Sequence, residues 1–250
     1  MKQKSIFLLL CCVTLIFAFL NGTLLAQKGK GRKYYEARGE IVWEVPTAKR
    51  MIALTFDDGP DARYTPQIAS LLKEYDAKAT FFVVGTRVQK NPEIIRQLLK
   101  DGNELANHTY SHPDLRKISE QRLKEEVTKT QETIYAATGF TPKLFRPPGG
   151  YYSESLIRVV KDAGFQVIMW SWHQDTRDWS DPGVKKIVKK VLKNARNGDI
   201  VLFHDYGGAR SQTVRALKEI LPELHRRGFH FVTVSELLMY QKKVNAVGKE

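Results

Sequence analysis

Cysteine is almost absent from this chain of 250 residues, and its two copies, Cys11 and Cys12, are adjacent within an apolar run near the N-terminus. If that run is removed, the remaining chain holds no thiol, so disulfide bonds are excluded as its stabiliser. The sequence also lacks internal repeats and any low-complexity tract beyond its basic ends. With 42% hydrophobic and 10% aromatic residues, the composition is that of one well-packed globular domain.

The N-terminus has the pattern of a targeting segment. Lys2 and Lys4 precede an apolar run, Ile6–Leu20, that contains no charged residue. The run is shorter than the roughly 20 residues of a membrane span, and small residues follow near Ala26, which favours a cleaved signal peptide. Leu24 extends the apolar character, so an uncleaved N-terminal anchor is the alternative. We therefore expect export to the extracellular space, the cell wall or the outer face of the membrane.

Composition divides the chain into four segments. Residues 1–26 are the predicted signal peptide or anchor, and residues 27–40 form a basic linker. Residues 41–240 form the single predicted catalytic domain, and residues 241–250 form a basic tail.

Basic residues exceed acidic ones, 40 against 27, which gives a formal net charge of +13. We expect an exported protein with this charge to contact the anionic surface of a cell wall. The alternative is a solvated surface that charge keeps soluble. Nucleic acid fits the charge but not the export signal, and membrane contact is expected only through an uncleaved N-terminal segment.

Apolar runs alternate with amphipathic segments across the predicted domain. The predicted strands are Met51–Phe56, Ala79–Val84, Glu104–Asn107, Lys143–Phe145, Gln166–Ser171, Ile200–Phe203 and Phe229–Val234. The predicted helices are Thr65–Tyr75, Ser119–Thr138, Ser153–Ala163, Pro182–Asn197 and Gln212–Arg227. Repeated alternation of strand and helix indicates an α/β fold with a parallel sheet. About seven strands in this length favour a (β/α) barrel, complete or incomplete, over an open doubly wound sheet.

Polar segments follow the predicted strands, where parallel α/β folds carry their functional loops. These segments are Thr55-Phe56-Asp57-Asp58-Gly59-Pro60, His108-Thr109-Tyr110-Ser111-His112, Arg146-Pro147-Pro148-Gly149-Gly150, Asp175-Thr176-Arg177-Asp178-Trp179 and Leu202-Phe203-His204-Asp205. They contain the candidate functional residues.

Two of these segments suggest metal chemistry. His108 and His112 are four residues apart, so both imidazoles share one face if the loop forms a helical turn. A nearby carboxylate would complete a three-ligand site that leaves positions for water and substrate. Asp57 and Asp58 project in different directions, so one can bind metal while the other faces the reacting water. Each motif also has a simpler interpretation, as surface histidines or as an ordinary turn.

His204 follows an apolar triplet and is a candidate general acid, with a histidine bonded to the backbone at the edge of the core as the alternative. Asp178 and Trp179 have two interpretations. Asp178 could be a carboxylate at the start of a helix, with Trp179 packing beside it. Alternatively, Asp178 could be the charge partner of another functional group, and the ring of Trp179 could contact a sugar. The other histidines of the domain lack such a setting and are interpreted as structural, surface or unassigned residues: His225, His230 and His173.

In order and composition, these five segments closely resemble the motif set of the polysaccharide deacetylase family with the NodB homology domain, carbohydrate esterase family four. The resemblance covers roughly residues 51–234. It implies a distorted (β/α) barrel, a single divalent metal ion and hydrolysis of the N-acetyl group of amino sugars in a cell-envelope polysaccharide. The basic charge and the export signal favour peptidoglycan, at N-acetylglucosamine or N-acetylmuramic acid, over a chitooligosaccharide.

The resemblance also implies roles for single residues. Asp58, His108 and His112 correspond to the metal ligands, Asp57 corresponds to the general base, and Thr109 would steady the histidine loop. Two histidines and a carboxylate would accept zinc, cobalt or nickel, and we expect zinc.

The remaining motifs supply the other groups by the same resemblance. Arg146 would hold the base, and the backbone N–H of Gly149 would stabilise the oxyanion. Asp178 would pair with His204, the general acid. Two residues would contact the sugar, at the groove wall and at the acetyl-methyl pocket respectively: Trp179 and Leu202.

Gly149 departs from the family pattern, because many relatives carry a side chain there. The oxyanion contact comes from the backbone, so catalysis is expected to survive, and Tyr151 and Tyr152 are expected to supply the missing wall. An O-acetyl esterase acting on xylan or another glycan is one alternative function. A non-catalytic wall-binding or signalling protein is the other. A phosphate-processing metalloenzyme would need a second metal cluster or a Gly-rich anion loop, and neither is visible in the sequence.

Overall fold

The computed structural model describes residues 30–247, so the predicted signal or anchor segment lies outside the described residues. Within that range, no helix combines the length and apolarity needed to cross a membrane. The chain from Gly39 onward forms one unit, which holds the sheet. A short helix, α2 (Arg32–Ala37), precedes this unit inside the predicted linker, and there Arg32 Nε donates a hydrogen bond to Glu36 Oε1 at 2.7 Å.

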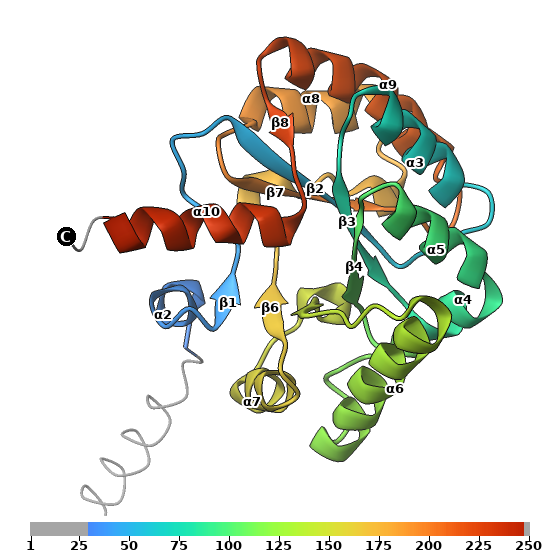
Figure 1. Ribbon diagram of the computed structural model, residues 1–250, viewed down its shortest axis with the longest axis vertical. Helices are drawn as coiled ribbons and strands as arrows, with labels where there is room; N and C mark the ends of the chain where they lie inside the picture. The colour runs from blue at the N-terminus through green and yellow to red at the C-terminus, as the bar shows by residue number, and fades with distance from the viewer. Residues whose placement is uncertain (1–29, 248–250) are drawn as a thin grey trace, which may run out of the picture. The chain divides into compact units, whose positions relative to one another are not determined.

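The sheet is built from parallel pairs of strands (Figure 1). Its strand order is β1 (Ile41–Val42), β6 (Gln166–Ile168), β5 (Leu144–Phe145), β4 (Glu104–Asn107), β3 (Ala79–Val83), β2 (Met51–Asp57) and β7 (Asp199–His204), while β8 (His230–Phe231) pairs with β2. Both β2 and β3 are buried along their whole length, which explains why they appear as nearly continuous apolar runs. The predicted α/β fold with about seven parallel strands in a distorted barrel is confirmed.

The two edges of the sheet meet through the segment that follows β1. Val45 N donates a hydrogen bond to Gly198 O at 2.9 Å, and Glu44 forms an antiparallel bridge with Asp199, the first residue of β7. We call this contact between residues 44–45 and 198–199 the closing seam. It draws the β1 edge and the β7 edge together, which curves the sheet into a distorted barrel.

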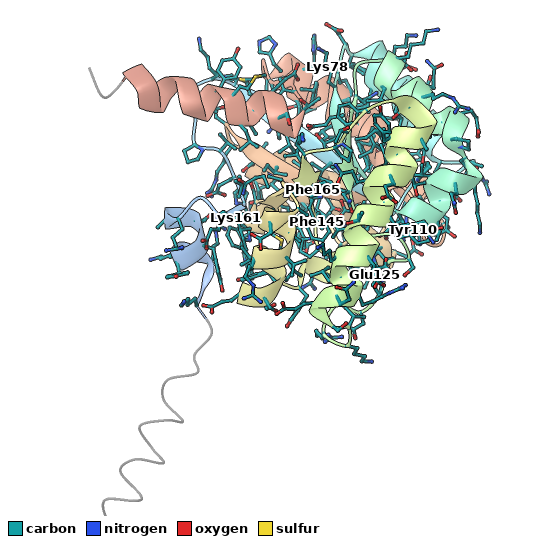
Figure 2. The ribbon with its side chains drawn as sticks, turned by 60° about the horizontal axis from the view of Figure 1, so that its bottom comes forward. Lys78, Tyr110, Glu125, Phe145, Lys161 and Phe165 are labelled. Atoms are coloured by element: carbon teal, nitrogen blue, oxygen red, sulfur yellow. The ribbon has the colours of Figure 1, made fainter. Side chains whose placement is uncertain are left out.

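Apolar side chains pack on both faces of β2. Ile52, Leu54 and Phe56 belong to the cluster that α3, α5, α8 and α9 cover, whereas Ala53 belongs to a second cluster that includes Leu237 of α10. This division follows from the alternation of side chains along a strand. Side chains fill the interior between sheet and helices, as Phe145 and Phe165 show (Figure 2).

Five helices match the predicted ones: α3 (Thr65–Glu74), α6 (Glu120–Thr138), α7 (Glu154–Asp162), α8 (Val184–Asn194) and α9 (Ser211–Arg226). The ends of α6 show why local sequence marks a helix well. Ser119 Oγ accepts a hydrogen bond from Arg122 N at its start, and Gly139 ends it with a φ of 71°.

Besides α2, three helices were not predicted: α4 (Gly85–Lys90), α5 (Pro92–Lys100) and α10 (Val234–Val247). The first two are short, at six and nine residues. In α5, Ile95 and Leu98 are buried at helical spacing, so the sequence contained a signal for this helix that the prediction overlooked. The last predicted strand pairs only over β8, because α10 begins at Val234 and continues through residues assigned to the tail. The fifth predicted strand also ends early, at Ile168, and a 3₁₀ turn, η2 (Trp172–Gln174), follows.

Candidate active site

A cavity of about 320 Å³ lies at the C-terminal ends of the central strands. Eight residues predicted from the sequence line it: Asp57, Asp58, His108, His112, Gly149, Trp179, Leu202 and His204. Two further predicted residues, Arg146 and Asp178, are fully buried and bond to lining side chains. The parallel sheet therefore brings together ten residues that span almost 150 positions of the chain, from 57 to 204.

Asp58, His108 and His112 place three ligand atoms within 4.8 Å of one another. Asp58 Oδ1 lies 3.0 Å from His112 Nε2 and 3.4 Å from His108 Nε2, and this oxygen is buried without a hydrogen-bond partner. His108 Nδ1 lies 2.7 Å from the carbonyl oxygen of Arg146, so Nδ1 carries the proton and Nε2 turns a lone pair toward the cluster. These donors fit a divalent cation and leave coordination positions for water and substrate.

The pKa of Asp58 agrees with a role as a metal ligand. Burial alone would raise the pKa of Asp58, but the contacts with His108 and His112 outweigh burial and hold that pKa below its usual range. The carboxylate is therefore ionised at neutral pH, as a metal ligand must be.

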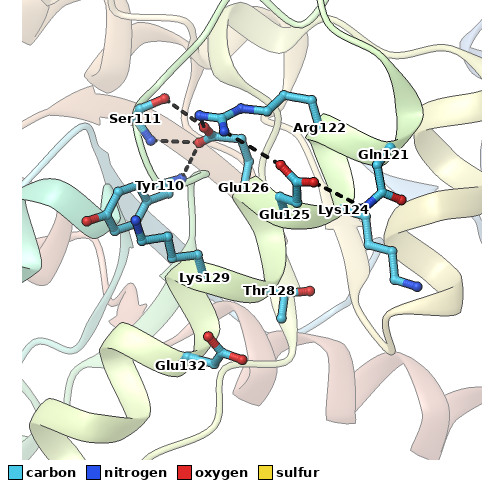
Figure 3. Close-up of a pocket in the computed structure, with 10 residues that line it drawn as sticks. All are labelled: Tyr110, Ser111, Gln121, Arg122, Lys124, Glu125, Glu126, Thr128, Lys129 and Glu132. Carbon is cyan, nitrogen blue, oxygen red and sulfur yellow. Dashed lines mark hydrogen bonds and ion pairs between the residues drawn. The ribbon is translucent and has the colours of Figure 1, made fainter.

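A buried carboxylate supports the histidine loop (Figure 3). Thr109 and His112 have φ angles of 66° and 57°, which are unfavourable for residues other than glycine. Glu126 Oε2 accepts hydrogen bonds from Tyr110 N at 2.8 Å and Ser111 N at 2.7 Å, and Glu126 Oε1 accepts one from Ser111 Oγ at 2.8 Å. These three bonds fix the backbone between the two histidines. Sequence reasoning missed Glu126, although its position beside Val127 on the buried stripe of α6 was an available signal.

Arg146 positions Asp57 from behind the cavity. Its Nη1 donates to Asp57 Oδ1 at 2.7 Å, and its other N–H groups bond to the carbonyl oxygens of Ile168 and Met169 at 3.2 and 2.7 Å. The guanidinium also packs over the Phe82 ring, 4.0 Å from its centre. Because the second oxygen, Asp57 Oδ2, lies 4.0 Å from His108 Nε2, the carboxylate faces the metal-ligand cluster.

Asp178 positions His204, which also lines the cavity. Asp178 Oδ1 accepts a hydrogen bond from His204 Nδ1 at 2.7 Å, and Asp178 Oδ2 accepts bonds from His204 N at 2.9 Å and Thr213 Oγ1 at 2.7 Å. Burial opposes the charged imidazole, but the hydrogen bond and charge of Asp178 raise the pKa of His204 to about 9. Asp57 and Asp58 add to this rise, so a cation bound beside them would lower the value again.

The cavity wall differs from the expectation at one point. Tyr151 is not among the lining residues, and the Tyr152 ring packs edge-on against Trp43, with centroids 5.6 Å apart. Trp170 lines the cavity instead, close to Gly150, where an added Cβ would lie 2.7 Å from the indole. The prediction missed Trp170 because the apolar run 166–171 was assigned to one strand.

The buried carboxyl group of Asp205, in the last motif, lies against the loop that follows β2. Asp205 Oδ2 accepts a hydrogen bond from Thr65 Oγ1 at 2.5 Å, and a Cβ at Gly59 would lie only 2.1 Å from the same oxygen. Burial raises the pKa of Asp205 to about 7. The loop after β2 therefore needs glycine at position 59 in order to pass this side chain.

Comparisons with known proteins agree with this geometry. Residues 44–168 match the family model described as polysaccharide deacetylase. The chain is 51% identical over 210 residues to a peptidoglycan-N-acetylglucosamine deacetylase of Bacillus cereus, covering 84% of this chain and 98% of that protein. It is 38% identical over 200 residues to a chitooligosaccharide deacetylase of a Bradyrhizobium species, covering 75% of this chain and 90% of that protein.

The fold is also shared with solved structures. The crystal structure of the Bc1960 peptidoglycan N-acetylglucosamine deacetylase superposes with a TM-score of 0.79 at 33% identity, covering 83% of this chain and 97% of that one. The similarity therefore extends over most of this chain and nearly all of that one.

Proposed function

The chain belongs to the polysaccharide deacetylase family, and from that premise we propose that it hydrolyses the N-acetyl group of amino sugars in peptidoglycan. The products are acetate and a free amine on the sugar. The chain is a hydrolase of carbon–nitrogen bonds, as the relatives' activities indicate. The single observation that best supports the proposal is the placement of Asp57 and the raised-pKa His204 beside one metal-ligand cluster.

Asp58, His108 and His112 would hold a divalent cation, which we propose to be zinc, because imidazole and carboxylate ligands suit this ion. When bound, it would supply Lewis-acid activation of the water and of the acetyl carbonyl. The fixed tautomer of His108 supports this assignment, since its Nε2 lone pair faces the cluster.

Asp57 would act as the general base that removes a proton from the attacking water. Arg146 keeps this carboxylate oriented toward the cluster through the 2.7 Å bond to Oδ1. The new bond joins the water oxygen to the acetyl carbon, and negative charge develops on the former carbonyl oxygen. The backbone N–H of Gly149 is the proposed donor to that oxygen.

His204 would act as the general acid. The carbon–nitrogen bond breaks only when the departing nitrogen receives a proton, because an amide anion leaves too slowly. His204 Nδ1 is bound to Asp178, so the proton for the leaving amine comes from Nε2. Leu202, which lines the cavity, would contact the acetyl methyl group, and the exposed Trp179 would contact the sugar ring.

The substrate class is tested by acetate release from peptidoglycan, N-acetylglucosamine oligomers and acetylated xylan. We expect the fastest release from peptidoglycan, loss of release with a chelator, and recovery when zinc is added back. Faster release from the oligomers would move the substrate to chitooligosaccharides. Release from xylan alone would establish the O-acetyl esterase instead.

We also propose that the protein is exported, with residues 1–26 as a cleaved signal or an anchor. Its basic surface would then contact anionic wall polymers. Helix α8 supports this, because it carries five lysines and no acidic residue while Ile187 and Val191 are buried. The mass of the secreted protein tests cleavage near Ala26. Salt-sensitive sedimentation with purified walls tests the contact, and binding unaffected by salt would contradict it.

A further inference from the structure

A second cluster of potential metal ligands lies at the closing seam. Glu44 follows β1, His173 lies in η2 and Asp199 begins β7, and their ligand atoms fall within 4.8 Å of one another. Together with the cluster in the cavity, it is one of two such groups among the described residues. Asp199 and His204 stand at opposite ends of β7, five positions and roughly 16 Å apart, so this cluster is separate from the active site.

The contact between His173 and Asp199 has the wrong geometry for a hydrogen bond. His173 Nε2 lies 2.9 Å from Asp199 Oδ1, yet this buried nitrogen has no hydrogen-bond partner. A nitrogen and an oxygen this close, with no hydrogen bond between them, have the spacing of two ligands that share one cation. Asp58 Oδ1 shows the same combination in the cavity, where it is unpartnered and 3.0 Å from His112 Nε2.

The surrounding residues fix the orientation of Asp199. Its Oδ2 accepts hydrogen bonds from Gln174 Nε2 at 2.9 Å and from Arg196 N at 2.8 Å. Both bonds use one oxygen, which leaves Oδ1 facing His173. Hydrogen bonds to the second oxygen of a carboxylate ligand are what orients such ligands in metal sites. The side chains of Gln174 and Asp199 are almost completely buried, so this arrangement is rigid.

We propose that Glu44, His173 and Asp199 bind a divalent cation that ties the closing seam of the barrel. One imidazole and two carboxylates suit zinc or manganese. With metal–ligand bonds of about 2.1 Å, adjacent ligands of an octahedral ion lie about 3 Å apart, which agrees with the 2.9 Å contact. The ion would join the segment after β1 to η2 and to β7, so its role is structural.

Metal content of the full chain tests the proposal. After equilibration with Zn²⁺ and removal of unbound ion, we expect two equivalents in the wild-type protein and one in His173→Ala. His230→Ala, which removes an exposed histidine elsewhere, should keep two. Acetate release by His173→Ala at saturating zinc should match the wild type, because His173 does not line the cavity.

A second measurement isolates the seam from the active site. In His112→Ala, where the cavity cluster is broken, Zn²⁺ should still raise Tm, and adding His173→Ala or Glu44→Gln should remove that rise. Three results would each overturn the proposal: one equivalent of zinc in the wild type, two equivalents in His173→Ala, or a zinc-induced rise in Tm that persists in the double variants. His173 would then be only an ion-pair partner of Asp199. Glu44→Gln covers the case in which His173→Ala fails to fold.

Discussion

Asp57 and His204 are direct partners in the register of β2 and β7. Neighbouring strands lie about 4.8 Å apart, so the sheet holds the proposed base and the proposed acid at adjacent positions of one rigid frame. Arg146 and Asp178 then fix the two side chains from behind. The relative placement of the proposed base and acid therefore follows from strand pairing, and side chains outside these two strands set their orientation.

Replacing Asp57 with asparagine should lower kcat by about 10²–10⁴-fold, because the amide cannot accept the water proton. Acetate release at saturating substrate and zinc measures this. Asp76→Asn is a matched control, since Asp76 is exposed and its φ of 47° suits asparagine. Near-normal turnover by Asp57→Asn would remove Asp57 from the role of base.

Replacing Asp178 with asparagine should shift the basic limb of the kcat–pH profile to lower pH. The charge and hydrogen bond of Asp178 raise the pKa of His204 against the effect of burial, so their loss leaves burial to lower it. His204 would then be deprotonated at neutral pH, and kcat there should fall by about 10²–10⁴-fold. Asp181→Asn, in the same loop but exposed, should keep the profile. A basic limb that does not move would contradict the pairing.

The metal-free protein should lose stability as the pH rises from 6.5 to about 9. His204 has a higher pKa in the folded chain than the ordinary 6.5, so its protonation stabilises the fold fully below pH 6.5, and this contribution disappears as the pH passes about 9. The free energy of urea unfolding across this range measures the effect. His204→Gln should flatten the dependence, and an equal slope in both proteins would refute it.

Replacing Glu126 with glutamine should weaken zinc binding by about 10–100-fold. Oε2 accepts from both loop N–H groups and Oε1 accepts from Arg122 Nη2, and the single oxygen of an amide cannot serve both sides. Turnover at saturating zinc should change less than affinity. Glu125→Gln provides the control one position away, on the exposed side of α6 (Figure 3). Equal zinc affinities for the two variants would show that Glu126 does not position the ligands.

Much of the fold was predictable because its signals are local. The alternation of strand and helix can be recognised from a few consecutive residues at a time. The same holds for helix ends, such as Ser119 at the start of α6 and Gly139 at its end. The closing seam was not predictable, because it joins Glu44 to Asp199 across 155 positions, and β1 is only two residues long. The sequence periodicity of so short a strand carries no information about its partner.

The candidate site was predictable where residues occur in ordered motifs, and less so where single side chains complete it. Trp170 lies within an apolar run, and Glu126 lies on the buried face of α6. No motif therefore distinguishes either residue from residues of the core. Tyr151 was placed at the wall by its position after Gly149 and Gly150. Both glycines have positive φ, and the chain that leaves them does not bring Tyr151 into the cavity.

The closing seam also affects how this chain can fold. The strand nearest the N-terminus pairs with β6, at a separation of 126 positions between Ile41 and Val167, and Val45 bonds to Gly198 later still. Contacts this distant in sequence pay a large loop-closure entropy before they form, which slows folding. During synthesis β1 therefore has no partner until β6 and most of the domain have been translated. Closure of the barrel is expected to be a late folding event.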